Sequence, residues 1–166
     1  MRGLARGFLA LERVTTQAAV AAACLGLLVA FLAGAWQVFT RFVLHEPSPW
    51  SEALVRQALI WMVLLGVAGA IRYGALVAID IARTAAHGWL RRGIELLILA
   101  ALLALFGILF WYGWAMAERV RFQRIAGLNV SIAWGYAAIP VGAAFAIVAA
   151  IAAAIAPRQE PSARPV

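Results

Sequence analysis

Two charged residues have the spacing of an interacting pair: Glu52 and Arg56 lie four positions apart, shortly after Pro49. Side chains at i and i+4 of a helix share a face and can pair. Ser48 before Pro49 is typical of an N-cap followed by the first helical residue, so Glu52 would lie near the positive end of the helix dipole. Residues 57–71 carry no charge. The stretch therefore predicts an ion pair at the start of a helix that enters a membrane.

The composition is that of a chain whose solvent is largely lipid. The chain is 66% hydrophobic and 13% charged, with a mean hydropathy of +0.93, whereas a soluble domain carries about 25% charged residues. A spanning helix needs about 20 apolar residues. We expect an all-α integral membrane protein with a single four-span domain over residues 1–156 and a disordered tail over 157–166. The four transmembrane helices are expected near residues 15–40, 49–73, 94–117 and 131–156.

Between the second and third spans, residues 75–92 are too polar to cross a membrane. The polar positions recur at steps of three and four, with apolar residues opposite: Asp80, Arg83, Thr84, His87 and Arg91. That periodicity predicts an amphipathic helix lying along the membrane interface. The alternative is a short solvated connector whose periodicity is accidental.

The first apolar stretch follows a basic leader with Arg2, Arg6 and Arg13. A signal peptide cleaved near Ala33-Gly34-Ala35 is therefore an alternative to a first span. The apolar run is about 20 residues long, beyond the usual 7–15 of a signal peptide. We expect an uncleaved first transmembrane helix.

The positive charge is all arginine and is shared unequally between the two sides of the membrane. With four spans both termini lie on one side, where nine arginines fall, against five on the other. Because positively charged loops stay in the cytoplasm, we expect both termini there. Aromatic residues expected at the outer ends of the spans agree with this map: Trp36, Trp50, Trp111, Trp114, Trp134 and Tyr136. Scattering of the arginines over short loops argues against nucleic-acid binding.

The predicted spans carry almost no ionisable residue at mid-depth, where such a residue is usually functional. A proton-coupled pump needs a carboxylate there. A haem held by two histidines is disfavoured because His45 and His87 fall on opposite sides of the membrane in this map. The sequence has no Ser/His/Asp set, metal-ligand spacing or glycine-rich phosphate loop. We therefore expect no enzyme activity, no cofactor and no metal, but a subunit that supports another membrane protein.

Small residues recur every four positions in two spans, a spacing that lets helices approach closely in a membrane. They are Ala18, Ala22, Gly26, Ala30 and Gly34 in the first span and Gly142, Ala146, Ala150 and Ala154 in the fourth. Trp61 lies too deep in the second span to anchor at the headgroups. We expect it to pack against another helix, within this chain or in a partner.

A set of motifs follows in a fixed order between Trp36 and Gly142. The motifs are Arg41-Phe42-Val43, Pro49-Trp50-Ser51-Glu52-Ala53-Leu54-Val55-Arg56, Trp61, Gly66, Arg72-Tyr73-Gly74, Ile79-Asp80 and Tyr136-Ala137-Ala138-Ile139-Pro140-Val141-Gly142. In order, spacing and four-span layout they resemble the small permease (DctQ-like) subunit of tripartite ATP-independent periplasmic (TRAP) transporters. Two positions depart from that family. Ala53 stands where a second acidic residue is usual, and Leu76 or Val77 where a His is common.

The resemblance implies a non-catalytic scaffold in the bacterial inner membrane. Its partner would be a large multi-span permease that carries the substrate and sodium sites, and a periplasmic binding protein would deliver an organic acid. Candidate residues for the partner interface or the outer rim are Arg41, Trp50, Glu52, Arg56, Trp61, Gly66, Arg72, Asp80, Tyr136 and Pro140. Candidates for docking the binding protein at the periplasmic face are Arg119, Arg121 and Arg124.

Simpler roles stay open for these residues, and a second function stays open for the chain. Arg41, Glu52 and Arg56 can instead cap and orient the helices, and the loop arginines can contact lipid headgroups. The alternative function is the membrane anchor subunit of a respiratory oxidoreductase, which predicts a haem or quinone site. A stand-alone small exporter is disfavoured by the missing carboxylate at mid-depth.

Overall fold

The computed structural model describes residues 2–46, 48–73 and 89–155. The four long helices are α1 (Arg2–Phe39), α2 (Pro49–Tyr73), α4 (Trp89–Arg119) and α5 (Ala133–Ile155). A π-helical turn, η1 (Thr40–Leu44), continues α1 toward the turn into α2. Each of the four regions contains a helix long and apolar enough to cross a membrane. The predicted all-α class with four membrane-spanning helices is confirmed.

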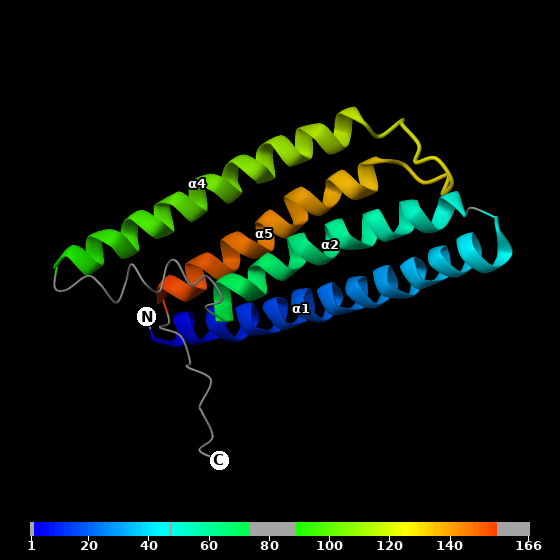
Figure 1. Ribbon diagram of the computed structural model, residues 1–166. Coiled ribbons are helices and arrows are strands. Elements are labelled where there is room, and N and C mark those ends of the chain that lie inside the picture. The colour runs from blue at the N-terminus through cyan, green and yellow to red at the C-terminus, as the bar shows by residue number, and fades with distance from the viewer. Residues whose placement is uncertain (1, 47, 74–88, 156–166) are drawn as a thin grey trace, which may run out of the picture.

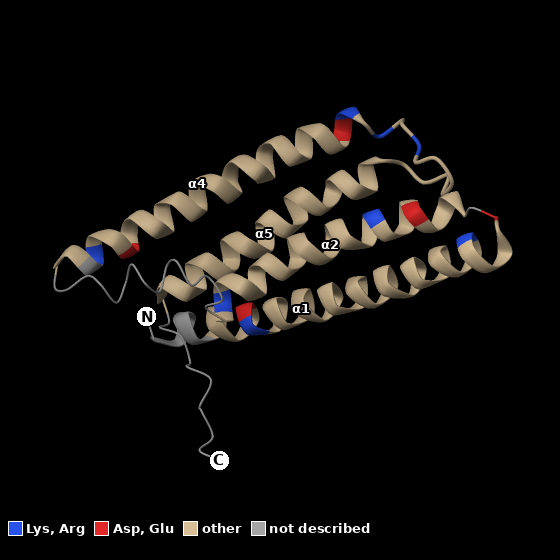
Figure 2. Ribbon diagram, in the orientation of Figure 1, with Lys and Arg blue, Asp and Glu red and all other residues tan. Residues whose placement is uncertain are grey.

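The four helices lie side by side in a row, in the order α1, α2, α5, α4 (Figure 1). α5 lies beside the other three long helices, whereas the backbone of α4 lies beside that of α5 alone among the helices that the structure describes. The start of α1 and the end of α5 lie at one end of the row, which we call the terminal end. η1 and residues 120–132 lie at the opposite end, which we call the hairpin end. Charged residues gather toward these two ends and leave the middle of each described helix uncharged (Figure 2).

Two helices extend beyond the predicted spans. α1 begins at Arg2, well before the expected start near residue 15, and it runs without interruption into η1. α4 begins at Trp89, so residues 89–92, expected to close the interfacial helix, belong to its first turn. The rest of that predicted helix, including Asp80, and the predicted tail over 157–166 lie outside the described residues. The interfacial helix stays a prediction.

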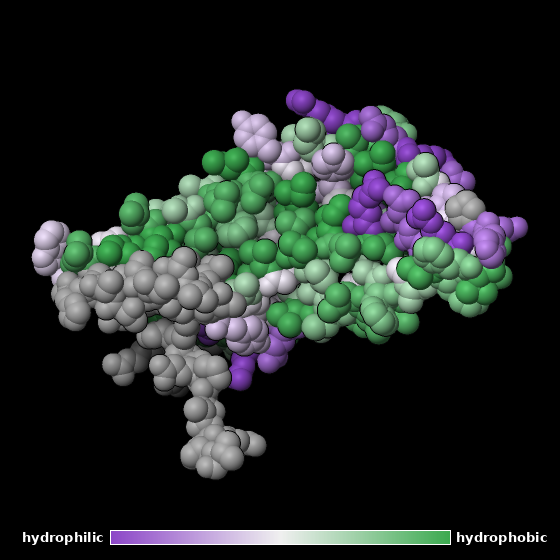
Figure 3. Space-filling view, viewed as in Figure 1, coloured by the Kyte–Doolittle hydropathy of each residue, from purple (hydrophilic) through white to green (hydrophobic). Residues whose placement is uncertain are grey.

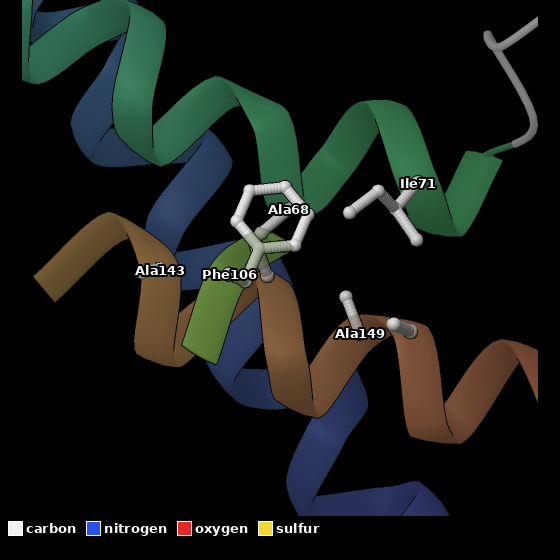
Figure 4. Packing of buried hydrophobic residues seen from close by; sticks show 7 residues of the cluster. Ala68, Ile71, Phe106, Ala143 and Ala149 are labelled. Atoms are coloured by element: carbon white, nitrogen blue, oxygen red, sulfur yellow. The ribbon is translucent and has the colours of Figure 1, made fainter. Parts of the chain in front are cut away.

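The core consists mostly of alanine, because small side chains let these helices come close together. Its main cluster joins Ala68 and Ile71 of α2, Phe106 of α4, and Ala143, Ala146, Ala149 and Ala150 of α5. Phe106 lies over Ala68 and supplies the one large ring of the cluster (Figure 4). α5 therefore holds the row together, with small residues on more than one side.

The predicted small-residue series holds on α5 better than on α1. Gly142, Ala146 and Ala150 are buried, and Ala154 is exposed at the helix end. On α1 the structure buries Ala19, Ala23, Ala30 and Ala33, while Ala18 and Ala22 are exposed. In the first half of α1 the series does not face the rest of this chain, and its contact with another helix stays a prediction. A strict step of four turns about 40° further round the helix each time, so a long series cannot stay on the one face that α1 packs against its neighbour.

At Gly142, α5 comes close to the backbone of α2. A Cβ atom placed on Gly142 would lie 2.7 Å from the carbonyl oxygen of Leu64 and 2.8 Å from its Cβ. Backbone atoms of a helix cannot rotate away as the tip of a side chain can. Glycine is therefore required here for the two helices to touch.

At the terminal end a buried ion pair joins α1 to α2. The Glu12 side chain is fully buried, and its Oε2 lies 3.2 Å from Nε of Arg72. The pair is in ionic contact, although its angle is not that of a hydrogen bond. The Thr16 hydroxyl donates to the other carboxylate oxygen of Glu12, at 2.8 Å. Because a buried charge is costly unless it is paired, this contact fixes how α1 lies against α2.

Replacing Gly142 by alanine is expected to destabilise the protein by about 1–3 kcal/mol, the usual cost of overpacking a tight contact. The measurement is the thermal unfolding midpoint in mild detergent. Gly107→Ala is the matched control, since a Cβ there meets nothing within 4 Å. Equal midpoints for the two variants would contradict a close α2–α5 contact.

Replacing Glu12 by glutamine is expected to cost about 3 kcal/mol, because the substitution leaves the largely buried charge of Arg72 without its partner. Glu52→Gln breaks an exposed pair instead and should cost under about 1 kcal/mol. Unfolding in detergent is again the measurement. Joining Glu12→Gln with Arg72→Gln should recover part of the loss. A double variant as unstable as the sum of the two singles would refute the pairing.

Candidate functional site

The turn between α1 and α2 is fixed by its hydroxyl groups and backbone. The Thr40 hydroxyl donates to the carbonyl of Gln37 at 3.1 Å and lies 3.3 Å from the Ser48 hydroxyl. The Ser48 hydroxyl in turn lies 2.5 Å from that of Ser51, which is fully buried. His45 adopts a left-handed conformation (φ 55°), and its N–H donates to the carbonyl of Thr40. Buried polar groups that are all partnered in this way specify one geometry for the turn.

The predicted pair at the start of α2 is present. α2 begins at Pro49, directly after Ser48, and Arg56 donates through Nη2 to Oε1 of Glu52 at 3.0 Å. Both side chains are exposed, at 72% for Arg56 and 62% for Glu52. An exposed pair at i and i+4 contributes only about 0.3–0.5 kcal/mol to stability. The pair therefore does little to hold the helices, and its charges remain available at the surface.

The loop between α4 and α5 folds back over the start of α2. Gly127 has a left-handed backbone (φ 91°), and a Cβ atom on it would lie 2.9 Å from backbone atoms of Pro49 and Trp50. Within the loop Arg124 and Ser131 form an antiparallel bridge, and the Ser131 hydroxyl donates to the carbonyl of Arg121 at 2.7 Å. The loop is thus closed on itself and seated against α2.

These elements enclose a groove of about 980 Å³ between the first half of α2, the start of α5 and the loop. Three charged side chains line the part of the groove nearest the hairpin end, which we call its outer part: Glu52, Arg56 and Arg124. Its walls are apolar and come from Leu59, Ile60, Val63, Leu64, Ile132 and Ile139. Figure 3 shows one face of the molecule, where hydrophilic side chains gather at the hairpin end and hydrophobic ones cover most of the middle.

The sequence candidates divide between this groove, the surface and the interior. Glu52, Arg56, Arg124 and Tyr136 come together at the groove. Arg41, Trp50, Arg119 and Arg121 are exposed elsewhere at the hairpin end, and Arg121 lies over the Phe122 ring at 4.6 Å. Arg72 lies at the terminal end with Glu12. A contact of any of these residues with another subunit stays a prediction.

Three candidates are engaged inside the chain. The Trp61 indole donates to the carbonyl of Trp134 at 3.1 Å, so this deep Trp packs against another helix of the same chain. A Cβ atom on Gly66 would be 4.0 Å from Ala23 of α1, and Pro140 is buried against Gly113 of α4. Trp61 and Pro140 are thus accounted for by packing within the row, whereas the space beside Gly66 would also admit an alanine.

Sequence reasoning missed Glu12 and Gln57. Glu12 was treated as part of a basic leader, although an acid just before the first apolar run and Arg72 just after the second must meet when two antiparallel helices pack. Gln57 lies against Gly135, where any side chain on α5 would overlap its amide. Neither the spacing of Gln57 nor its type distinguishes it in the sequence. Among the described residues no group of three His, Cys, Asp or Glu side chains is placed to hold a metal ion.

Comparison with known proteins identifies a family whose match includes the motifs between Trp36 and Gly142. The model of the family described as "Tripartite ATP-independent periplasmic transporters, DctQ component" matches residues 30–159. A relative, the sialic acid TRAP transporter small permease protein SiaQ of Vibrio cholerae serotype O1, is 33% identical over 112 residues. That alignment covers 68% of this chain and 65% of the relative. Since the family model matches more than half of the chain, the chain belongs to the DctQ family, the small permease component of TRAP transporters.

Proposed function

We propose that this small permease subunit is a non-catalytic scaffold for the large permease of its transporter. In this proposal the large permease takes up an organic acid together with sodium, and a periplasmic binding protein delivers that acid. The observation that carries the scaffold role is the open row of helices. A row encloses no central pathway, and it offers two broad apolar faces and a free edge at α4 to a partner.

The distribution of polar groups supports the same role. Substrate sites of secondary transporters lie at mid-membrane and use interrupted helices or ionisable side chains. In the described helices the charged residues lie toward the ends (Figure 2), and the α5 proline, Pro140, is buried within a continuous helix. The outward surface of α4 is apolar, with Leu96, Leu97 and Leu105 exposed. Such a surface suits contact with lipid or another membrane protein.

We propose further that the chain lies in the bacterial inner membrane with the terminal end in the cytoplasm and the hairpin end in the periplasm. The excess of arginines on the side of the termini supports this orientation. Exposed Trp36, Trp50 and Trp134 toward the hairpin end suit a membrane interface at that end, since tryptophan is favoured at both interfaces. The organic-acid class of substrate is supported by the name of the relative, a sialic acid transporter subunit.

The contacts proposed for this subunit use different parts of the hairpin end. Arg41 and Trp50 are exposed beside the α1–α2 turn, where they are candidates for contact with the large permease. Arg119 and Arg121 are exposed where α4 ends, and the cationic side chain of Arg121 lies over an exposed ring, Phe122. A cationic surface with an exposed ring is suited to docking an acidic protein such as the proposed binding protein.

The scaffold role predicts a stable complex. The tagged chain, expressed with the genes beside its own and extracted in mild detergent, is expected to retain a polytopic permease, identified by mass spectrometry. An anchor of a respiratory oxidoreductase would instead retain a flavin or iron–sulfur subunit, and haem would appear in the absorption spectrum. Recovery of such a subunit, or of the chain alone, would overturn the scaffold proposal.

If the arginines at the end of α4 dock the binding protein, their replacement should lower the affinity for that protein, and replacement of an arginine at the terminal end should not. Arg119→Gln with Arg121→Gln should weaken the apparent affinity for the binding protein several-fold, more at low salt than at high salt, because rim charges act through screened attraction. Uptake by reconstituted transporter at increasing binding-protein concentration measures this affinity. Arg92→Gln, an exposed arginine of α4 near the terminal end, is the control. Equal affinities for the two variants would exclude the docking role.

A further inference from the structure

We propose that the groove between α2, α5 and the α4–α5 loop is a binding site for one phospholipid whose headgroup carries both a phosphate and a primary ammonium, as in phosphatidylethanolamine. The phosphate would lie between Arg124 and Arg56, the ammonium at Glu52, and an acyl chain along the apolar walls. The site requires only that the chain lies in a membrane, and it does not depend on the scaffold role.

The length of the groove fits one leaflet. Its α2 wall runs from Glu52 at the outer part to Val63 and Leu64 at the inner part. Eleven residues of helix rise about 16 Å, and half of a hydrocarbon core is about 15 Å. A ligand with a polar head at Glu52 would therefore have its apolar part at the depth of the acyl chains of a single leaflet. A small soluble ligand has no use for apolar walls of that extent.

The charges at the outer part match a zwitterionic headgroup. Two guanidinium groups and one carboxylate line the groove there, which leaves one net positive charge. Arg56 already donates to Glu52, whereas no carboxylate of the described residues lies within ion-pair distance of Arg124. Guanidinium groups bind phosphate oxygens through paired N–H donors. The exposed Glu52 oxygens can accept N–H donors from an ammonium group beside that phosphate.

Close contacts between the elements that form its walls fix the shape of the groove. Gly127 lies against the backbone of Pro49 and Trp50, so the loop carries Arg124 toward the same part of α2 that bears Glu52. On the opposite wall Gly135 leaves the space that the Gln57 amide occupies. Because glycine at both positions permits a close approach that a side chain would prevent, the walls are preformed and a lipid would not have to separate them.

Native mass spectrometry of the full chain, with any subunit that copurifies, tests the site. Phosphatidylethanolamine, phosphatidylcholine and phosphatidylglycerol are titrated into delipidated protein. One phosphatidylethanolamine per chain is expected to bind most tightly, because choline offers no N–H donor to Glu52 and glycerol no cation. Arg124→Gln should weaken this binding about tenfold, the factor that corresponds to loss of a hydrogen bond to a charged group. Arg92→Gln, far from the groove, is the control.

Glu52→Gln separates a headgroup site from general attraction to lipid. This substitution removes the acceptor for the ammonium and frees Arg56, so the preference should shift from phosphatidylethanolamine toward phosphatidylglycerol. Equal retention of the three lipids by the wild type, or lipid preferences that no groove variant changes, would overturn the proposal. So would a complex in which Val63 is replaced by a photoreactive residue and that residue cross-links to a segment of the large permease and to no lipid.

Discussion

The contact of α5 with α2 at Gly142 is the interaction on which the rest of the row depends. In lipid an apolar side chain gains little by leaving its solvent, so helices associate where backbones come close and many weak contacts add up. Gly142 places α5 against the backbone of Leu64, and the alanines that follow extend this contact. α5 then also receives Phe106 from α4. Because α4 lies beside α5, its attachment to the α1–α2 hairpin runs mainly through α5.

The α1–α2 hairpin carries two ion pairs that have opposite physical roles. Glu12 and Arg72 are largely withdrawn from water, so each offsets the cost of burying the charge of the other. The pair therefore specifies how the two helices lie. Glu52 and Arg56 are both largely exposed and belong to one helix, so their pairing leaves the tertiary structure almost unaffected. The same residue types thus fix the fold at one end and equip a surface at the other. Burial decides between these roles, and local spacing does not reveal it.

The four helices and the pair on α2 could be predicted because they follow from local rules: apolar length, the Ser48-Pro49 start and the i, i+4 spacing. Arg124 was predicted as a residue that docks the binding protein at the periplasmic face, and that role stays a prediction. Its place opposite Glu52 arises from a fold of the loop that depends on Gly127, and no local pattern encodes it. Glu12 and Arg72 are separated by 60 positions in the sequence, so their contact required the register between two helices. The buried face of α1 follows Ala19, Ala23, Ala30 and Ala33 and not a strict step of four, because a four-residue step does not match the turn of a helix.

The two ion pairs also set what thickness of bilayer suits the row. Between Arg56 and Arg72, α2 rises about 24 Å, less than the hydrocarbon core of about 30 Å. Arg72 is tied to Glu12 and cannot reach freely toward the headgroups. The uncharged part of α4, residues 96–117, rises about 33 Å. The uncharged lengths of α2 and α4 therefore differ, and a bilayer that matches α4 would have to thin beside α2, inside the row, at an elastic cost of fractions of a kcal/mol per ångström.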